Sequence, residues 1–141
     1  MSKDWVQDIS DMHKKFAVKE IVQKFDRAKL YQFLKFRLEC LDEELDEAWH
    51  ALDNDETAPE EIVDAIIDLC VFAIGTLDLF GVDGHIAWDE VYKANITKEV
   101  GIKEGRPNPY GLPDLRKPAG WQAPSHEGNH GLLPKAFSNV Q

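Results

Sequence analysis

Apolar side chains recur at intervals of three or four residues over most of the first hundred positions, which is the spacing of a helix that buries one face. The pattern predicts four helices, over residues 5–16, from Asp26 or Arg27 to Leu52, over 59–80 and over 85–100. Pro59, followed by two glutamates, is typical of the first turn of a helix. Gly81 and Gly84 predict the turn that separates the last two helices.

The third predicted helix is apolar around much of its circumference. Its apolar positions are Ile62, Ala65, Ile66, Leu69, Cys70, Phe72, Ala73 and Leu77. A helix of this kind belongs in the middle of a bundle or at a subunit interface. The sequence therefore predicts an all-α fold, a four-helix bundle in which the second and third helices are joined by a short loop.

The composition changes after residue 100. Six of the seven prolines and six of the nine glycines lie in residues 101–141, which leaves little room for regular structure. Because aromatic residues such as Trp121 still offer apolar surface, we expect an ordered but irregular arm that wraps the bundle at least as far as Pro124. A chain of 141 residues suits a single domain, with the bundle over about 5–100 and the arm over 101–141.

Composition narrows the class of protein. With 43% hydrophobic and 30% charged residues the chain is globular, and no apolar run approaches the ~20 residues of a membrane span. The first residues lack the apolar stretch of a secretory signal, and Cys40 and Cys70 suit buried thiols, so we expect a cytoplasmic protein. The net charge of −10 argues against nucleic-acid binding, which needs a continuous basic surface.

Acidic side chains are concentrated between Leu38 and Tyr92, where 17 of the 26 occur and lysine and arginine are absent from the sequence. Two groups have helical spacing: Glu44 with Glu47, and Glu61 with Asp64 and Asp68. Each group spans an arc of about 60° on its helix, so its members share a face. Because a short loop makes the two helices antiparallel neighbours, we expect the acidic faces to meet.

Facing groups of carboxylates repel one another and lose solvation unless cations lie between them. Carboxylate-only ligation is typical of Mg²⁺, with Mn²⁺ as a substitute. A solvated acidic face explains most such runs, but Asp64 and Asp68 alternate with isoleucines on a helix expected to be mostly buried. We therefore predict a metal site with the ligands Glu44, Glu47, Glu61, Asp64 and Asp68.

The acidic groups match a signature of two motifs, E-x-x-E and then E-x-x-D after a spacer. They read Glu44-Leu-Asp-Glu47 and, after thirteen residues, Glu61-Ile-Val-Asp64. In this signature the chain resembles the MazG-type all-α nucleoside triphosphate pyrophosphohydrolases. Four more segments are similar to a subgroup common in bacteriophages and bacteria: Met12–Phe16, Asp64–Thr76, Trp88–Lys98 and Lys117–Pro124. The resemblance covers about residues 5–125, with one departure at Ala65, where many relatives have a glutamate paired with the aspartate at 68.

The resemblance implies Mg²⁺-dependent hydrolysis of a (d)NTP to the monophosphate and pyrophosphate, in a helical bundle that forms a homodimer or homotetramer. Two or three ions would bridge the acidic faces and the triphosphate. We expect Glu44 or Glu47 to act catalytically by accepting the proton of the attacking water. The enzyme would control a nucleotide pool, in the host cytoplasm if a phage encodes it. Consumption of dGTP or GTP is a hypothesis for that setting that the sequence does not test.

Basic and aromatic residues are candidates for substrate binding. They are Lys93, Asn95 and Lys98 in the fourth predicted helix, Arg37 in the second, and Trp88. Asn95 and Lys98 share a helix face and are predicted to hold phosphate or sugar. Arg37 lies about two turns before the first acidic group, within reach of carboxylates or phosphate. Trp88 could stack on a base, as could Trp49 and Trp121, although tryptophan is more often part of a core.

Two other functions stay open. A ferritin-like di-iron protein is suggested by the E-x-x-H spacing of Glu47 and His50, but the only other instance, Glu127 with His130, lies in a glycine-rich tail. A non-catalytic acidic module that imitates the charge of nucleic acid would need only surface acids and leaves Asp68 unexplained. The histidines add little, and His13 has no clear charged partner in the sequence.

Overall fold

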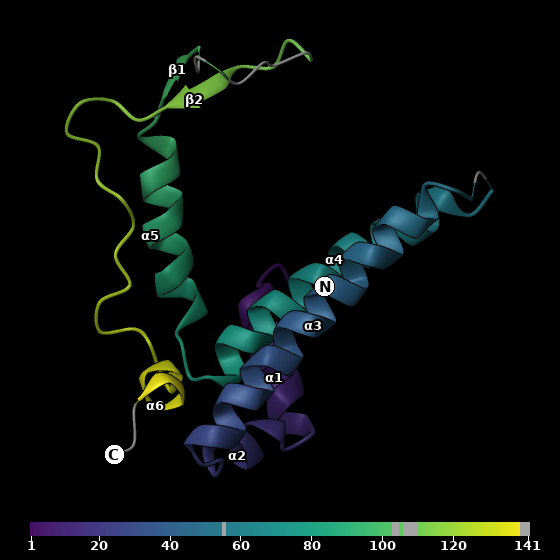
Figure 1. The fold of residues 1–141 in the computed structure, drawn as a ribbon, viewed down its shortest axis with the longest axis vertical. Helices are drawn as coiled ribbons and strands as arrows, with labels where there is room; N and C mark the ends of the chain where they lie inside the picture. The colour runs from purple at the N-terminus through teal and green to yellow at the C-terminus, as the bar shows by residue number, and fades with distance from the viewer. Residues whose placement is uncertain (55, 103–104, 106–109, 139–141) are drawn as a thin grey trace. The chain divides into compact units, whose positions relative to one another are not determined.

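The computed structural model describes residues 1–54, 56–102, 105 and 110–138, and its elements are labelled in Figure 1. In chain order they are α1 (Trp5–Lys15), α2 (Val18–Gln23), α3 (Arg27–Ala51), α4 (Ala58–Leu79), α5 (Gly84–Ile96), β1 (Glu99–Gly101), β2 (Asp114–Arg116) and α6 (Leu133–Phe137). The predicted all-α class is confirmed, because the described residues contain only two strands of three residues each.

The chain forms two compact units. Unit 1 consists of residues 1–84 and 130–141, and unit 2 of residues 85–129. The predicted boundary between a bundle and an arm at residue 100 does not coincide with this division, because α5 belongs to the unit that contains most of the tail. The place of α5 in a four-helix bundle, and the single domain, stay predictions. The parts of the predicted arm at 103–104, 106–109 and 139–141 lie outside the described residues.

Unit 1 is built on α3 and α4, which run side by side along their length (Figure 1). They are joined by a short connection, so the predicted antiparallel pair is confirmed. The start of α3 is fixed by its cap, since the Asp26 carboxylate accepts a hydrogen bond of 2.8 Å from the backbone N–H of Lys29. α1 also packs on α4 and is capped in the same way by Asp4.

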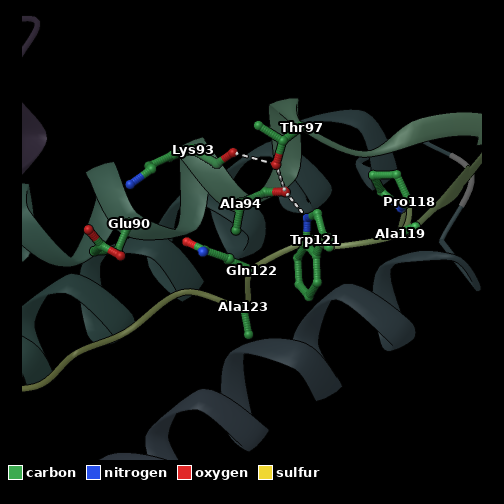
Figure 2. Close-up of a pocket in the computed structure, with 10 residues that line it drawn as sticks. Glu90, Lys93, Ala94, Thr97, Pro118, Ala119, Trp121, Gln122 and Ala123 are labelled. Atoms are coloured by element: carbon green, nitrogen blue, oxygen red, sulfur yellow. Dashed lines mark hydrogen bonds between the residues drawn. The ribbon is translucent and has the colours of Figure 1, made fainter.

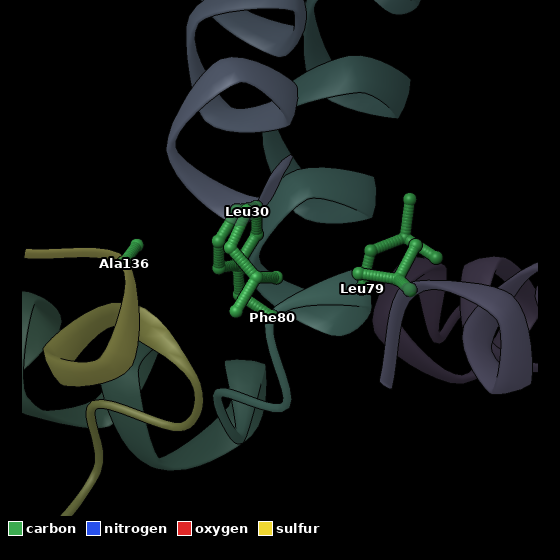
Figure 3. Packing of buried hydrophobic residues seen from close by; sticks show 5 residues of the cluster. Leu30, Leu79, Phe80 and Ala136 are labelled. Atoms are coloured by element: carbon green, nitrogen blue, oxygen red, sulfur yellow. The ribbon is translucent and has the colours of Figure 1, made fainter. Parts of the chain in front are cut away.

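The core of unit 1 contains side chains from four helices and the segment that ends α4. Its buried members are Val22, Leu30, Leu79, Phe80 and Ala136, most of which are labelled in Figure 3. The Phe33 ring stacks on Phe80 with the ring centres 5.9 Å apart. Ala136 brings α6 into this core, and the backbone N–H of Leu132 donates to the Phe80 carbonyl at 2.6 Å.

The expectation that residues 101–141 are irregular is wrong in two places. α6 forms because Leu132, Leu133 and Ala136 share a helix face that buries on the core, and Pro134 is tolerated in its first turn. β1 pairs antiparallel with β2, with Val100 opposite Leu115. The short helix α2, which follows Ala17 in the left-handed conformation, was also not predicted.

The fourth predicted helix ends earlier than expected. α5 stops at Ile96 rather than near residue 100, because Glu99–Gly101 forms β1 instead. The Thr97 hydroxyl donates to the carbonyls of Lys93 and Ala94 at 3.0 and 3.1 Å, so a side chain satisfies these carbonyl oxygens in the last turn of the helix. Over the described residues no single helix is long and apolar enough to cross a membrane; α4 and α5 meet that test only when taken together across the break between them.

Candidate functional site

Four of the five predicted acidic ligands interact across α3 and α4. Glu44 is partly buried on α3, and its Oε2 is buried without a hydrogen-bond partner. Burial raises the pKa of this carboxyl above its usual range. The neighbouring charges that raise the pKa further belong to Glu47 on the same helix and to Asp68 and Asp64 on α4. None of the ion pairs found among the described side chains involves these four residues.

The chemistry of this acidic cluster, defined as Glu44, Glu47, Asp64 and Asp68, fits a hard divalent cation. A buried carboxylate oxygen with no donor is a group that a cation would satisfy, and carboxylate oxygens are the ligands that Mg²⁺ prefers. The cluster is not assembled around a single point, since no three His, Cys, Asp or Glu side chains of the described chain are arranged to hold a metal ion. Which carboxylates bind directly stays a prediction.

Glu61, the fifth predicted ligand, has a different environment. Its Oε1 accepts a hydrogen bond of 2.5 Å from the Thr57 hydroxyl at the start of α4. Its charge is not among those that raise the pKa of Glu44. The side chain therefore serves the first turn of α4, and its role as a metal ligand stays a prediction.

The prediction that the acidic part of α4 is mostly buried is wrong for this chain by itself. Asp64 is exposed and Asp68 is half-buried. The apolar residues beside them are also open to solvent, with Val63 64% and Ile67 43% exposed. The periodicity identified an apolar surface correctly, but a single chain does not cover it over the first turns of α4.

Arg37 lies farther along the α3–α4 pair, and its contacts are with the protein. Its Nε donates to the Thr76 hydroxyl at 3.0 Å, and one terminal nitrogen donates to the Phe72 carbonyl at 3.1 Å. The guanidinium also lies 4.9 Å from the centre of the Phe72 ring, and burial lowers its pKa. These contacts join α3 to α4, so a role of Arg37 in substrate binding stays a prediction.

The sequence did not predict a buried charged group, which is Asp78 with its partners His13 and Lys19. His13 on α1 lies 2.7 Å from an Asp78 oxygen on α4, and the Lys19 ammonium lies 3.2 Å from the other oxygen. Although burial by itself raises the pKa of Asp78, the bonds to His13 and Lys19 outweigh it and leave the pKa below the usual range. The interpretation of His13 as a residue without a charged partner is therefore wrong. The partners lie 65 residues apart, beyond the reach of local spacing.

Unit 2 contains a pocket of about 290 Å³ between α5 and the segment from Pro118 to Ala123 (Figure 2). Its lining residues are Glu90, Lys93, Ala94, Thr97, Pro118, Ala119, Gly120, Trp121, Gln122 and Ala123. The Trp121 indole N–H donates to the Ala94 carbonyl at 2.7 Å, which fixes the segment against the helix. The ammonium groups of Lys117 and Lys98 lie 4.8 and 5.8 Å from the centre of the indole.

Unit 2 places the predicted substrate-binding residues differently. Lys93 lines the pocket. Lys98 lies beside Trp121 and donates to the Asn95 side-chain oxygen at 2.8 Å, so these two do share a face. Trp88 is 65% exposed and does not line the pocket. Trp121, one of three tryptophans considered for base stacking, is the one that does.

Comparison with known protein families gives a match over more than half of the chain. A family model described as phosphoribosyl-ATP pyrophosphohydrolase matches residues 10–95. The matched span contains the whole acidic cluster and most of α5, and it ends before the pocket segment at 118–123. No curated protein and no solved structure matches significantly.

Proposed function

The chain belongs to the phosphoribosyl-ATP pyrophosphohydrolase family, and from this we propose that it is a Mg²⁺-dependent enzyme that cleaves a (d)NTP to the monophosphate and pyrophosphate. The family is part of the MazG-like all-α NTP pyrophosphatase superfamily, so the resemblance seen in the sequence is confirmed. The family supports the reaction class, a pyrophosphohydrolase. The nucleotide, the ion and the residue roles are our proposal.

The buried, unpartnered oxygen of Glu44 is the observation that supports a catalytic acidic cluster most directly. A partly buried carboxylate that is repelled by three other carboxylates and has no basic partner destabilises the fold, and a purely structural role gives no reason to retain it. When bound, Mg²⁺ would offset the negative charge of these carboxylates and of the substrate phosphates. Glu44, Glu47, Asp64 and Asp68 would hold the ions, with Glu61 as a further candidate at the start of α4.

In the proposed reaction, water attacks a phosphorus at the bond between the α- and β-phosphates. That phosphoanhydride bond breaks, and pyrophosphate leaves from the monophosphate. The proton lost by the water passes to Glu44 or Glu47. A positioned carboxylate in this role contributes about 10²–10⁴-fold to the rate.

A nucleotide panel tests the proposal. Purified protein is incubated with Mg²⁺ and each of the standard dNTPs and NTPs, and with phosphoribosyl-ATP because the family description names it. Monophosphate and pyrophosphate are then quantified. We expect equal amounts of the two products from at least one nucleotide, and no reaction when EDTA removes the metal. If no nucleotide in the panel is consumed, the proposal is wrong.

A pair of variants assigns the reaction to the cluster. Glu47→Gln should lower kcat by at least about 100-fold, because it removes a charge that holds metal or accepts the proton. Glu43→Gln is the matched control, since Glu43 is an exposed glutamate on the same helix whose charge is not among those that affect Glu44. Hydrolysis by Glu47→Gln at the rate of the control would contradict the assignment.

A further inference from the structure

The pocket of unit 2 contains an acid and a base that are not paired with each other. Glu90 and Lys93 lie one turn apart on α5 and both line the pocket (Figure 2). No ion pair joins them among the described residues, although residues three apart on a helix often form one. Glu90 accepts one hydrogen bond, of 3.2 Å, from the backbone N–H of Ser125 at its Oε2. The other carboxylate oxygen and the ammonium remain available to a ligand.

The rest of the pocket suits a flat ring. Its other wall consists of residues 118–123, which include the Gln122 amide and the Trp121 indole that its hydrogen bond to Ala94 holds in one orientation. A fixed indole is a good surface for a base to stack on. A volume of about 290 Å³ lies at the lower limit of pockets for drug-sized ligands, about 300–1,000 Å³, so a ring fits better than a whole nucleoside triphosphate.

Positive charge lies next to this ring-sized space. The ammonium groups of Lys117 and Lys98 are both within 6 Å of the centre of the Trp121 ring. Neither forms an ion pair with a carboxylate in the described part of the chain. A ligand with a ring in the pocket and an anionic group outside it would satisfy both features, and a nucleotide has this form.

We propose that the pocket of unit 2 binds the base of a nucleotide, with Glu90 and Lys93 reading one edge of that base. The edge must present a donor beside an acceptor: Glu90 accepts from an N–H, and Lys93 donates to the adjacent carbonyl oxygen or ring nitrogen. Guanine and uracil offer a ring N–H beside a carbonyl, and adenine and cytosine offer an amino group beside a ring nitrogen. Ribose phosphate without a base has hydroxyl groups but no flat ring that stacks on Trp121 and presents such an edge.

This proposal goes beyond the proposed function, because it assigns a base-binding site to unit 2, whereas the acidic cluster belongs to unit 1. It also depends on a part of the chain outside the family match, since 118–123 form the second wall of the pocket. The specificity would thus depend partly on residues that the family match does not cover. A site that hydrogen-bonds both the donor and the acceptor on a base edge discriminates strongly, because a base with a different edge leaves Glu90 or Lys93 without a hydrogen-bond partner.

Binding can be measured without catalysis. Calorimetry in EDTA, with no divalent metal, uses GMP, UMP, AMP and CMP as ligands, and ribose 5-phosphate and purine riboside 5′-monophosphate as controls. The last keeps the purine ring and lacks the donor for Glu90. We expect at least one of the four nucleotides to bind, and both controls to bind at least about tenfold more weakly, as the loss of a charge-assisted hydrogen bond requires. The nucleotide that binds best identifies the kind of edge that is read.

Three variants locate the binding. Glu90→Gln keeps an acceptor for the Ser125 N–H but loses the charge, and Lys93→Met keeps the apolar stem without the ammonium. Each should weaken the best nucleotide at least about tenfold. Asp89→Asn is the matched control, because Asp89 is an exposed acid on the same helix that does not line the pocket, and it should bind as the wild type does. Equal binding of ribose 5-phosphate and the nucleotides, or unchanged binding by Glu90→Gln, would overturn the proposal.

The two proposals fail separately. If the triphosphate panel shows no hydrolysis while Glu90-dependent binding of a monophosphate is present, the pocket stands and the enzyme assignment falls. If hydrolysis occurs and Glu90→Gln binds the best nucleotide as tightly as the wild type does, the pocket proposal is wrong and the enzyme stands. Hydrolysis in the panel together with Glu90-dependent binding of a monophosphate supports both.

Discussion

The charges of Glu47, Asp68 and Asp64 act on the Glu44 carboxylate, and one of its oxygens is buried without a donor. Each of these features destabilises the metal-free fold, because burial and like charges both oppose the ionised form. A bound cation would reverse the sign of both effects. The stability of the protein should therefore report metal binding at this residue without any assay of hydrolysis.

Glu44→Gln should raise the Tm in EDTA by a few degrees, because it removes charge repulsion worth about 1 kcal/mol. The same change should reduce the rise in Tm that Mg²⁺ produces in the wild type, since a ligand is lost. Differential scanning fluorimetry with and without Mg²⁺ measures both effects, and Glu43→Gln should behave as the wild type does. A wild type whose Tm does not respond to Mg²⁺ or Mn²⁺ would argue against a metal site.

The ionisation of Asp78 should make the free energy of unfolding depend on pH. Its pKa is lower in the folded protein than in an unfolded chain, about 3.9, so the ionised form stabilises the fold. The stabilisation is complete above the unfolded pKa and is lost as the pH falls through the folded pKa. Asp78→Asn should cost roughly 2–4 kcal/mol of unfolding free energy at pH 7, because it leaves His13 and Lys19 without a buried anion.

Urea titrations between pH 3 and pH 7 test this prediction. The wild type should lose stability below about pH 4, and Asp78→Asn should show a smaller loss over the same range. Asp11→Asn is the control, since the contacts of Asp11 are exposed, a hydrogen bond of 2.8 Å from the Gln7 amide and a contact of 3.9 Å with Lys14, and the change should alter stability by less than about 1 kcal/mol. Equal acid sensitivity in the wild type and Asp78→Asn would contradict the role of the ion pair.

At the residue scale, the sequence predicted the side-chain arrangements that follow from helical periodicity. Glu44, Glu47, Asp64 and Asp68 share helix faces, and a short loop brings those faces together, so their meeting followed from local rules. The pair of His13 and Asp78 did not follow, because it depends on how α1 lies on α4. The pocket residues Glu90 and Gln122 were missed for the same reason, as their approach depends on the path of the tail.

Among the elements, α6 depends on the close approach of two backbones. Gly131 has φ +52°, and a Cβ added there would collide with the Phe80 carbonyl, next to the hydrogen bond from Leu132 to Phe80. A side chain at 131 would therefore push α6 away from the core that Ala136 completes. The glycine is needed for this contact as well as for its backbone conformation.

Gly131→Ala should accordingly lower the free energy of unfolding by more than the strain of a left-handed alanine alone. Gly128→Ala is the matched control: Gly128 has φ +75° with no atom within 4 Å of the added Cβ, so it should cost only the strain of a left-handed alanine, about 1–2 kcal/mol. We expect Gly131→Ala to cost at least about 2 kcal/mol more, measured by urea unfolding. Equal costs for the two variants would show that α6 does not depend on this contact.

The long helices were predictable because local signals mark them. The Asp26 cap and the apolar stripe place the start of α3 within one residue of its position. α2 and α6, with six and five residues, are too short for periodicity to identify, and α6 lies among prolines and glycines that indicate loops. The end of α5 was placed too late because β1 pairs with β2 through residues that are far apart in the sequence, such as Glu99 with Arg116.

At the scale of the whole molecule, apolar surface remains open on the two central helices. On α3 and the residue that caps its end, the exposed apolar residues Leu38, Leu45, Trp49 and Leu52 follow helical spacing, and on α4 Val63, Ile66 and Ile67 do the same. Stripes of this kind on a helix pair mark an interaction surface more often than a solvated one. They support our proposal that the protein is a homodimer or homotetramer, with copies covering the apolar residues beside the acidic cluster.

Trp49→Glu tests this proposal, because it places a charge in the middle of the α3 stripe at a side chain that is 64% exposed in one chain. If copies meet there, burial of an unpaired charge should shift the protein toward monomer in sedimentation velocity. Trp5→Glu is the control, an exposed tryptophan on α1 outside both stripes, and should leave the assembly unchanged. A wild type that sediments as a monomer at every concentration would overturn the proposal. A stable oligomer of Trp49→Glu would instead show that copies meet on another surface, since the substituted carboxylate would then remain in water.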